Sequence, residues 1–168
     1  MLQTAQQVPS SSNLYSLSVD RGQKKTIIVM KMHIPQVNTS EFPQTRNILK
    51  LYLPTILKSI CYNEEQLPFY KEVSKTEIGH LFEHILLEYL CIVKLENGYD
   101  SVCYEGVTDW NWLRDPKGTF HITIKATNEE LDILSVALDR SMILINAILS
   151  KEENISLRLQ MPHATTRH

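Results

Sequence analysis

The segment 75–95 constrains the fold more than any other part of the sequence. Projected as a helix, it carries apolar side chains on nearly every side, and such a helix is stable only when other elements cover most of its surface. Ser74 followed by Glu77 predicts a capping box at its start, and Gly98 predicts its end. We therefore expect a helix that is buried on most of its faces.

The ionisable residues of this helix are confined to one sector, about 140° wide at about 100° per residue. That sector contains His80, Glu83, His84, Leu87, Glu88 and Cys91. No Lys or Arg lies near it in the sequence, so burial would leave imidazoles and carboxylates without a countercharge, at a cost of several kcal/mol. A bound cation would remove that cost.

The spacing of these residues fits zinc. His80 and His84 are one helical turn apart, so their ring nitrogens can converge on one tetrahedral ion. Glu83 lies beside them, where it can accept a proton from metal-bound water, so H-x-x-E-H predicts an inverted zincin motif with Glu83 as the catalytic base. The alternative is a solvated surface stripe, which would normally also carry Lys or Arg.

The third protein ligand is Glu88 in our interpretation, because it lies one turn beyond His84. Three ligands from successive turns strain the geometry, so residues of a predicted hairpin remain alternatives. Those alternatives are Cys103, Glu105, Asp109 and His121.

The other segments predict an α+β fold of two layers, with helices covering a mainly antiparallel sheet in the order β-α-α-β-β-α. Pro54 should kink or end the first helix, and Asn128 should cap the last. The two central strands should form a hairpin with an extended loop. In chain order we expect a strand at 24–34, helices at 45–57 and 75–95, strands at 99–106 and 119–126, a helix at 129–150 and a closing strand at 153–161.

Composition predicts one ordinary soluble domain, with 43% hydrophobic and 21% charged residues. We expect a mobile tail at 1–12, a metallohydrolase-like domain at 13–160 and a second tail at 161–168. A net charge of −2 gives no reason to expect nucleic acid or a membrane as partner, and the apolar stretches look too short to span a bilayer. The start has no secretory signal and the three cysteines show no CxxC spacing, which predicts a cytoplasmic protein with reduced cysteines.

The central helix also carries a family resemblance. TEIGHLFEHILLEYL, residues 76–90, resembles the stretch of the amino-terminal domain of cyanophycin synthetase that reads approximately T-x-x-G-H-x-x-E-H-x-x-x-E-L. Weaker matches in the same order extend the resemblance over residues 13–150. They are NLYSL, IIVMKMHI, NILKLYLPTIL and GTFHITIKA, the last followed by a long helix.

The resemblance implies a metal-dependent peptidase that trims an Asp–Arg polymer into primers. It implies that His80, His84 and Glu88 bind the metal and that Glu83 is the catalytic base. The ATP-grasp and ligase domains of the synthetase are absent, so we expect no polymer synthesis. The segment EGVTDW, at 105–110, lacks the arginine of the family's corresponding stretch, which leaves the substrate open. The motif is also similar to those of pitrilysin-type peptidases and S-ribosylhomocysteine lyase.

We therefore expect a zinc-dependent hydrolase of a peptide or isopeptide bond, with the Asp–Arg polymer or a related arginyl isopeptide as the first substrate to consider. Two alternatives remain. One is a non-catalytic binding or assembly module of the same fold, and the second is a metal-dependent lyase that acts on a small molecule. The sequence leaves homo-oligomerisation open.

Overall fold

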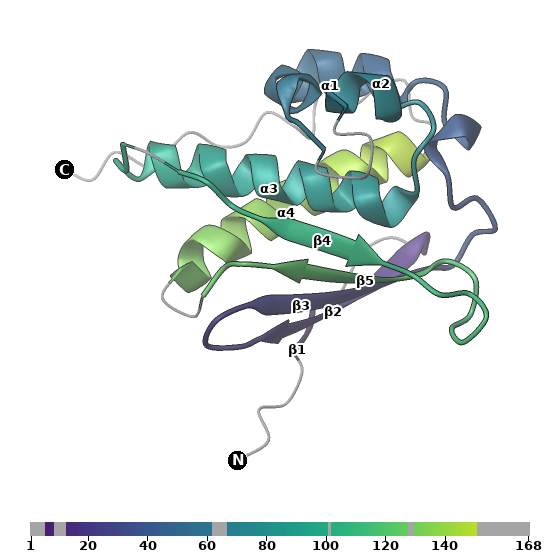
Figure 1. Ribbon diagram of the computed structural model, residues 1–168, viewed down its shortest axis with the longest axis horizontal. Helices are drawn as coiled ribbons and strands as arrows, with labels where there is room; N and C mark the ends of the chain where they lie inside the picture. The colour runs from purple at the N-terminus through teal and green to yellow at the C-terminus, as the bar shows by residue number, and fades with distance from the viewer. Residues whose placement is uncertain (1–5, 9–12, 62–66, 101, 128–129, 151–168) are drawn as a thin grey trace.

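The computed structural model describes residues 6–8, 13–61, 67–100, 102–127 and 130–150. Its strands form one antiparallel sheet of five, in the order β1-β2-β3-β5-β4 (Figure 1). The strands are β1 (Gln6–Val8), β2 (Tyr15–Arg21), β3 (Thr26–Met32), β4 (Gly106–Asp109) and β5 (Thr119–Ile124). The mainly antiparallel α+β fold predicted from the sequence is confirmed.

The hairpin of β2 and β3 shows why one face of the sheet is covered. Buried and partly exposed residues alternate along both strands, which is the pattern of a sheet with one face on the core and one facing water. Tyr15, Leu17 and Val19 of β2 and Ile28 and Met30 of β3 all point into the core. Their side chains create the apolar face on which the helices pack.

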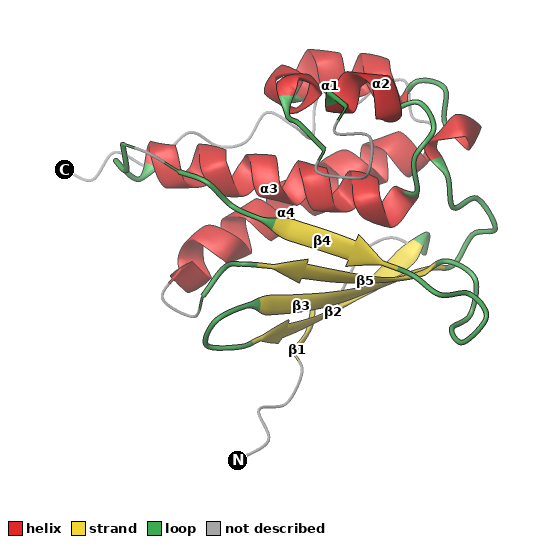
Figure 2. Cartoon of the chain, viewed as in Figure 1, coloured by secondary structure: helices red, strands yellow, loops and turns green. Residues whose placement is uncertain are grey.

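The helices lie over that face of the sheet (Figures 1 and 2). They are α1 (Thr45–Tyr52), α2 (Phe69–Glu72), α3 (Ile78–Glu96) and α4 (Leu131–Ser150). The helix α3 packs against α4, β4 and β5, whereas α1 and α2 lie on the far side of α3 from the sheet. The helices therefore reach further from the sheet than the single covering layer predicted from the sequence.

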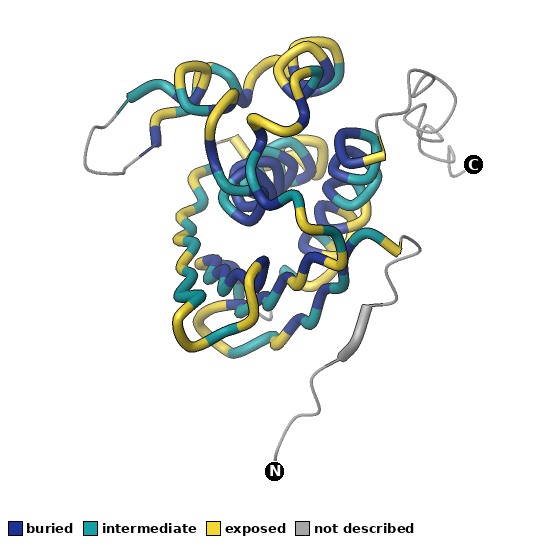
Figure 3. Tube along the Cα trace, turned by 90° about the vertical axis from the view of Figure 1, so that its right-hand side faces the viewer, coloured by how far each residue is buried: buried dark blue, intermediate teal, exposed yellow. Residues whose placement is uncertain are grey.

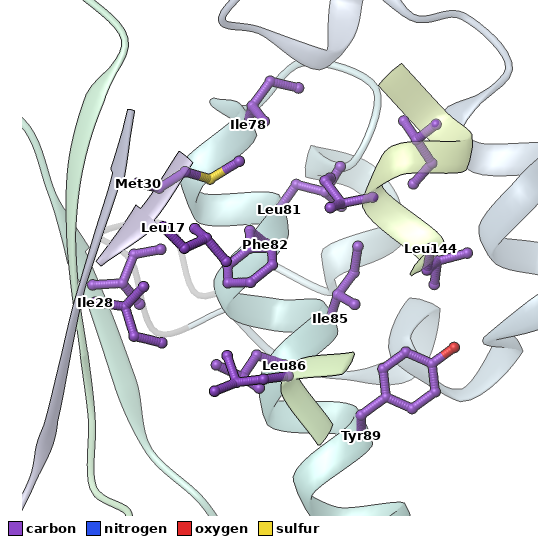
Figure 4. Close-up of a cluster of buried hydrophobic side chains, with 14 of the residues drawn as sticks. Leu17, Ile28, Met30, Ile78, Leu81, Phe82, Ile85, Leu86, Tyr89 and Leu144 are labelled. Carbon is purple, nitrogen blue, oxygen red and sulfur yellow. The ribbon is translucent and has the colours of Figure 1, made fainter. Parts of the chain in front are cut away.

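The core forms where α3 meets the sheet (Figure 4). Phe82 of α3 faces Leu17 and Ile28 of the β2–β3 hairpin, and all three are buried. Ile85 projects from the other side of α3, towards the buried Leu144 of α4. Gly79 allows the close approach of α3 to β5, because a Cβ at this position would lie only 2.3 Å from the ring of Phe120. Burial along the chain in Figure 3 follows this arrangement, with α3 buried along most of its length.

Three segments differ from the sequence-based prediction. Strand β2 was not predicted, although its alternating pattern is that of a half-buried strand. The strand expected at 99–106 begins only at Gly106, where it pairs with β5. The short helix α2 lies between the two predicted helices at 45–57 and 75–95, where no element was predicted. The predicted order β-α-α-β-β-α therefore lacks β1, β2 and α2.

The predicted capping box of the central helix is wrong. Helix α3 begins at Ile78 with Glu77 as its N-cap, and no side chain caps it. A capping box is present instead at Asn38 and Glu41, at the start of a short 3-10 turn. Gly98 does follow the end of α3 with a φ of 86°, as the sequence predicts for a helix end.

The prediction that the apolar stretches are too short to span a bilayer is wrong for helix α4. Its 20 residues have the length and mean hydropathy of a membrane span. Core helices of soluble proteins meet the same criteria, and half of the most apolar stretch is buried inside the domain, so α4 is a weak candidate. The predicted cap at Asn128 and the closing strand at 153–161 lie outside the described residues. The segment predicted as a tail at 1–12 includes β1.

Candidate metal centre

Helix α3 brings two imidazoles together, and a cysteine from an earlier segment joins them. The candidate ligand atoms of Cys61, His80 and His84 all lie within 4.8 Å of one another. Cys61 Sγ is 3.3 Å from Nε2 of His80. A thiolate and two imidazoles are ligands that Zn²⁺ prefers, so these three residues could hold a metal ion.

Backbone pairing holds Cys61 against α3. Ile60 and Pro68 form an isolated antiparallel bridge, and the backbone N–H of Cys61 donates to the carbonyl of Leu67 over 3.1 Å. The N–H of Phe69 donates to the carbonyl of Ser59 over 2.8 Å. The segment that carries the thiol is therefore anchored on both sides, and Cys61 is only 4% exposed.

Phe69 fixes the orientation of both imidazole rings. Its ring stacks on that of His84, with centroids 3.9 Å apart and planes inclined by 17°. The ring of His80 meets Phe69 edge-on, with centroids 6.0 Å apart. These contacts leave each imidazole little rotational freedom, which reduces the entropy lost when an ion binds.

Hydroxyl groups engage the Nδ1 atom of each imidazole. Thr76 Oγ1 is 2.7 Å from Nδ1 of His80, and Ser59 Oγ is 3.4 Å from Nδ1 of His84. The Ser59 hydroxyl donates to the carbonyl of Ile56, so it is placed to accept the Nδ1 proton of His84. The lone pair of His84 then lies on Nε2. Such contacts fix the tautomer and orientation of metal-binding histidines.

Burial keeps both imidazoles neutral. It lowers the pKa of His84 to about 3, with a smaller contribution from the neighbouring His80. Burial also lowers the pKa of His80, although Glu72 and Glu77 act in the opposite direction. Because a metal binds the neutral imidazole, no proton has to leave either ring at neutral pH.

Glu83 lies on the same helix but points to the sheet. The Thr108 hydroxyl donates to Glu83 Oε2 over 2.6 Å. A Cβ on Gly106 would lie 2.9 Å from Oε1, so the glycine makes room for the carboxylate beside β4. Glu83 is 5% exposed, and burial raises its pKa while the Thr108 hydrogen bond lowers it. A buried carboxyl with a raised pKa is a common property of catalytic acids and bases.

The cluster of Cys61, His80 and His84 opens into a cavity of about 970 Å³. Helix α3 contributes His80, Glu83, His84, Leu87, Glu88 and Cys91 to its wall. This is the polar sector predicted from the sequence, and the solvated-stripe alternative does not hold for Glu83 and His84, which are buried.

The predicted third ligand, Glu88, lines the cavity but is not part of the cluster of ligand atoms. Among the hairpin alternatives, Cys103 and Glu105 also line the cavity, and Glu105 forms an ion pair with Lys125. Asp109 and His121 do not line it. The ring of His121 contacts Asp115, with Nε2 and Oδ2 3.1 Å apart.

Cys61 was missed as a ligand by the sequence analysis. It lies 19 residues before His80 and forms no spacing motif with the histidines. The only sequence signal was chemical, since cysteine is one of the residue types that bind zinc.

No known protein family matches the sequence, and no curated protein matches it either.

Proposed function

We propose that this protein is a zinc-dependent hydrolase of a peptide or isopeptide bond. The observation that carries the proposal is the convergence of Cys61, His80 and His84 in an open cavity that the buried Glu83 also lines. A structural zinc site uses four protein ligands, whereas a catalytic site uses three and keeps one position for water or substrate. The ion, when bound, would acidify that water and polarise the scissile carbonyl.

Cys61 replaces Glu88 as the third ligand in this proposal. Its sulfur already lies within reach of both imidazoles, and thiolate is a better partner for zinc than a more distant carboxylate. Glu88 remains in the cavity, one turn beyond His84, where it can contact substrate.

Glu83 acts as the general base. Its pKa is raised by burial, so its carboxylate is a better proton acceptor than an exposed glutamate. The Thr108 hydroxyl occupies one of its oxygens and holds the carboxyl in one orientation. This arrangement assigns Thr108 the role of a positioning residue.

The lining of the cavity favours a cationic substrate. It includes the carboxyl groups of Glu72, Glu77, Glu83, Glu88 and Glu105 and one lysine, Lys75. A cleft lined mostly by one sign of charge attracts ligands of the opposite sign. The arginyl isopeptides implied by the family resemblance meet this requirement.

A second candidate function rests on the contact between Cys61 and His80. A cysteine within 3.3 Å of an imidazole, whose second nitrogen contacts Thr76, also has the geometry of a nucleophile with its base. In that case the protein would be a cysteine hydrolase that needs no metal. The non-catalytic binding module and the metal-dependent lyase considered from the sequence are compatible with the same cavity.

Turnover assays with and without metal separate these functions. The zinc-loaded protein should cleave members of a panel of lysine- and arginine-bearing peptides and β-aspartyl-arginine isopeptides. Chelation should abolish cleavage, and zinc alone should restore it. Cleavage that survives chelation but is lost in Cys61→Ser would establish the cysteine mechanism. No cleavage of any panel member by zinc-loaded protein would contradict the hydrolase and favour the binding module.

A further inference from the structure

Strand β4 is both an edge of the sheet and a wall of the cavity. It is the last strand in the order β1-β2-β3-β5-β4, so within the described residues no strand pairs with its outer side (Figure 1). Gly106, Val107 and Thr108 of this strand line the cavity. An edge strand beside a candidate catalytic site presents backbone groups directly to whatever enters the cavity.

The register of the sheet fixes which backbone groups face outwards. The N–H of Lys125 donates to the carbonyl of Glu105 over 2.8 Å, and these residues are in register with the β4–β5 ladder. In an antiparallel ladder the hydrogen-bonded pairs alternate along the strand. Val107 and Asp109 therefore bond to β5, whereas the N–H and C=O groups of Gly106 and Thr108 point to the open edge.

The side chains of these two residues leave the approach clear. Gly106 has no side chain, and the Thr108 hydroxyl turns towards Glu83 on α3. The outward backbone groups of Gly106 and Thr108 are thus next to the proposed base. Ser59, Ile60, Cys61 and the two histidines of α3 line the same cavity.

We propose that β4 binds the main chain of an extended peptide, which adds a sixth strand to the sheet and passes through the cavity. Main-chain hydrogen bonds to Gly106 and Thr108 would hold the peptide, and every second side chain would face α3. The acidic residues on that side, Glu88 among them, favour lysine or arginine at those positions. The inference deepens the proposed hydrolase function and rests on it for the choice of a peptide as ligand.

Amide hydrogen exchange measured by NMR tests this directly. The protein is full-length, zinc-loaded Glu83→Gln, in which the peptide should persist because the base is absent. The probe is an acetylated and amidated peptide of alternating alanine and lysine. Without peptide, the amides of Gly106 and Thr108 should exchange fast and those of Val107 and Asp109 slowly. At saturating peptide, exchange at Gly106 and Thr108 should slow by about tenfold or more.

A matched peptide with a methylated backbone nitrogen at every alanine and every lysine is the control. Methylation removes each N–H that an added strand must donate, so this peptide should leave the β4 amides unchanged. Unchanged exchange at Gly106 and Thr108 with millimolar alanine–lysine peptide overturns the proposal, whether or not the peptide binds elsewhere.

The exchange experiment and the cleavage assay can fail separately, so they distinguish the edge-strand proposal from the hydrolase proposal. If wild-type protein cleaves the probe peptide in a zinc-dependent manner while the β4 amides do not change, the hydrolase stands and the edge-strand proposal fails. If the β4 amides are protected but no peptide is cleaved, the peptide groove stands and the hydrolase fails.

Discussion

Cys61 Sγ lies 3.3 Å from Nε2 of His80, although the two residues are 19 positions apart in the chain. The contact depends on the segment 59–69, which is closed by backbone hydrogen bonds and holds the thiol over the helix. It converts a pair of histidines on one helix into a group with three candidate ligands. The effect of this contact on zinc affinity can be measured without an activity assay.

The first prediction concerns the third ligand. Cys61→Ser should weaken zinc binding at least about tenfold, because removal of even an outer-shell partner of a metal ligand costs about 10- to 100-fold. Glu88→Gln should change it little. Competition with a chelator of known affinity gives the dissociation constants, and Cys103→Ser is the matched control. A larger loss in Glu88→Gln than in Cys61→Ser would return the ligand role to Glu88.

A second prediction concerns the hydroxyl beside His80. Thr76→Val keeps the shape of the side chain but removes the group that contacts Nδ1 at 2.7 Å. Zinc affinity should fall about 10- to 100-fold, the usual effect of losing such a partner. Thr108→Val serves as the comparison, since Thr108 contacts Glu83 and not a histidine. Equal zinc affinity in Thr76→Val and the wild type would show that the hydroxyl does not orient the ligand.

The third prediction separates catalysis from metal binding. Glu83→Gln has almost the same shape and can still accept the Thr108 hydrogen bond, but Gln cannot accept a proton at neutral pH. It should keep zinc and lower kcat by about 10²- to 10⁴-fold, the usual contribution of a general base. Unchanged kcat in the variant would rule out Glu83 as the base.

Stability of the metal-free protein should depend on pH through the two histidines. Burial lowers the folded-state pKa of His84 to about 3, whereas an unfolded histidine has a pKa of about 6.5. Below that value the unfolded state binds more protons, so acid favours unfolding. The free energy of unfolding should therefore fall by about 1 kcal/mol per pH unit for each such imidazole as the pH decreases from about 6.5.

Two more groups modify this pH profile. The lowered pKa of His80 acts in the same direction as that of His84. The raised pKa of Glu83 acts in the opposite direction, because the folded state binds the extra proton, and offsets part of the loss at lower pH. Urea unfolding at several pH values gives the slope, and His84→Gln should reduce it. The same slope in His84→Gln and the wild type would contradict this account of the pH dependence.

Much of the fold was predictable from local patterns. The apolar circumference of α3, the β-branched run of β3 and the stripe along α4 each specify an element without reference to the rest of the chain. Strand β2 was not predicted, although Tyr15, Leu17 and Val19 alternate with polar residues, which is the local pattern of a half-buried strand.

The candidate site, too, was only partly predictable from local patterns. His80, Glu83 and His84 share one helix, so their proximity follows from helical spacing alone. The contribution of Cys61 depends on how the segment 59–69 closes and packs on α3, which no local pattern encodes. Thr108 reaches Glu83 only because β4 pairs with β5 beside the helix. Contacts of this kind come from tertiary structure and need coordinates.

The metal content of the purified protein tests the central claim most directly. Protein prepared without chelator should contain near one equivalent of zinc per chain by elemental analysis, and His84→Ala should contain almost none. After a chelator has removed the metal from the wild type, dialysis against zinc and then against chelator-free buffer should restore one equivalent of zinc per chain. A wild-type protein that stays folded, binds no more zinc than His84→Ala and takes up no other divalent metal would contradict the metal centre and the hydrolase built on it.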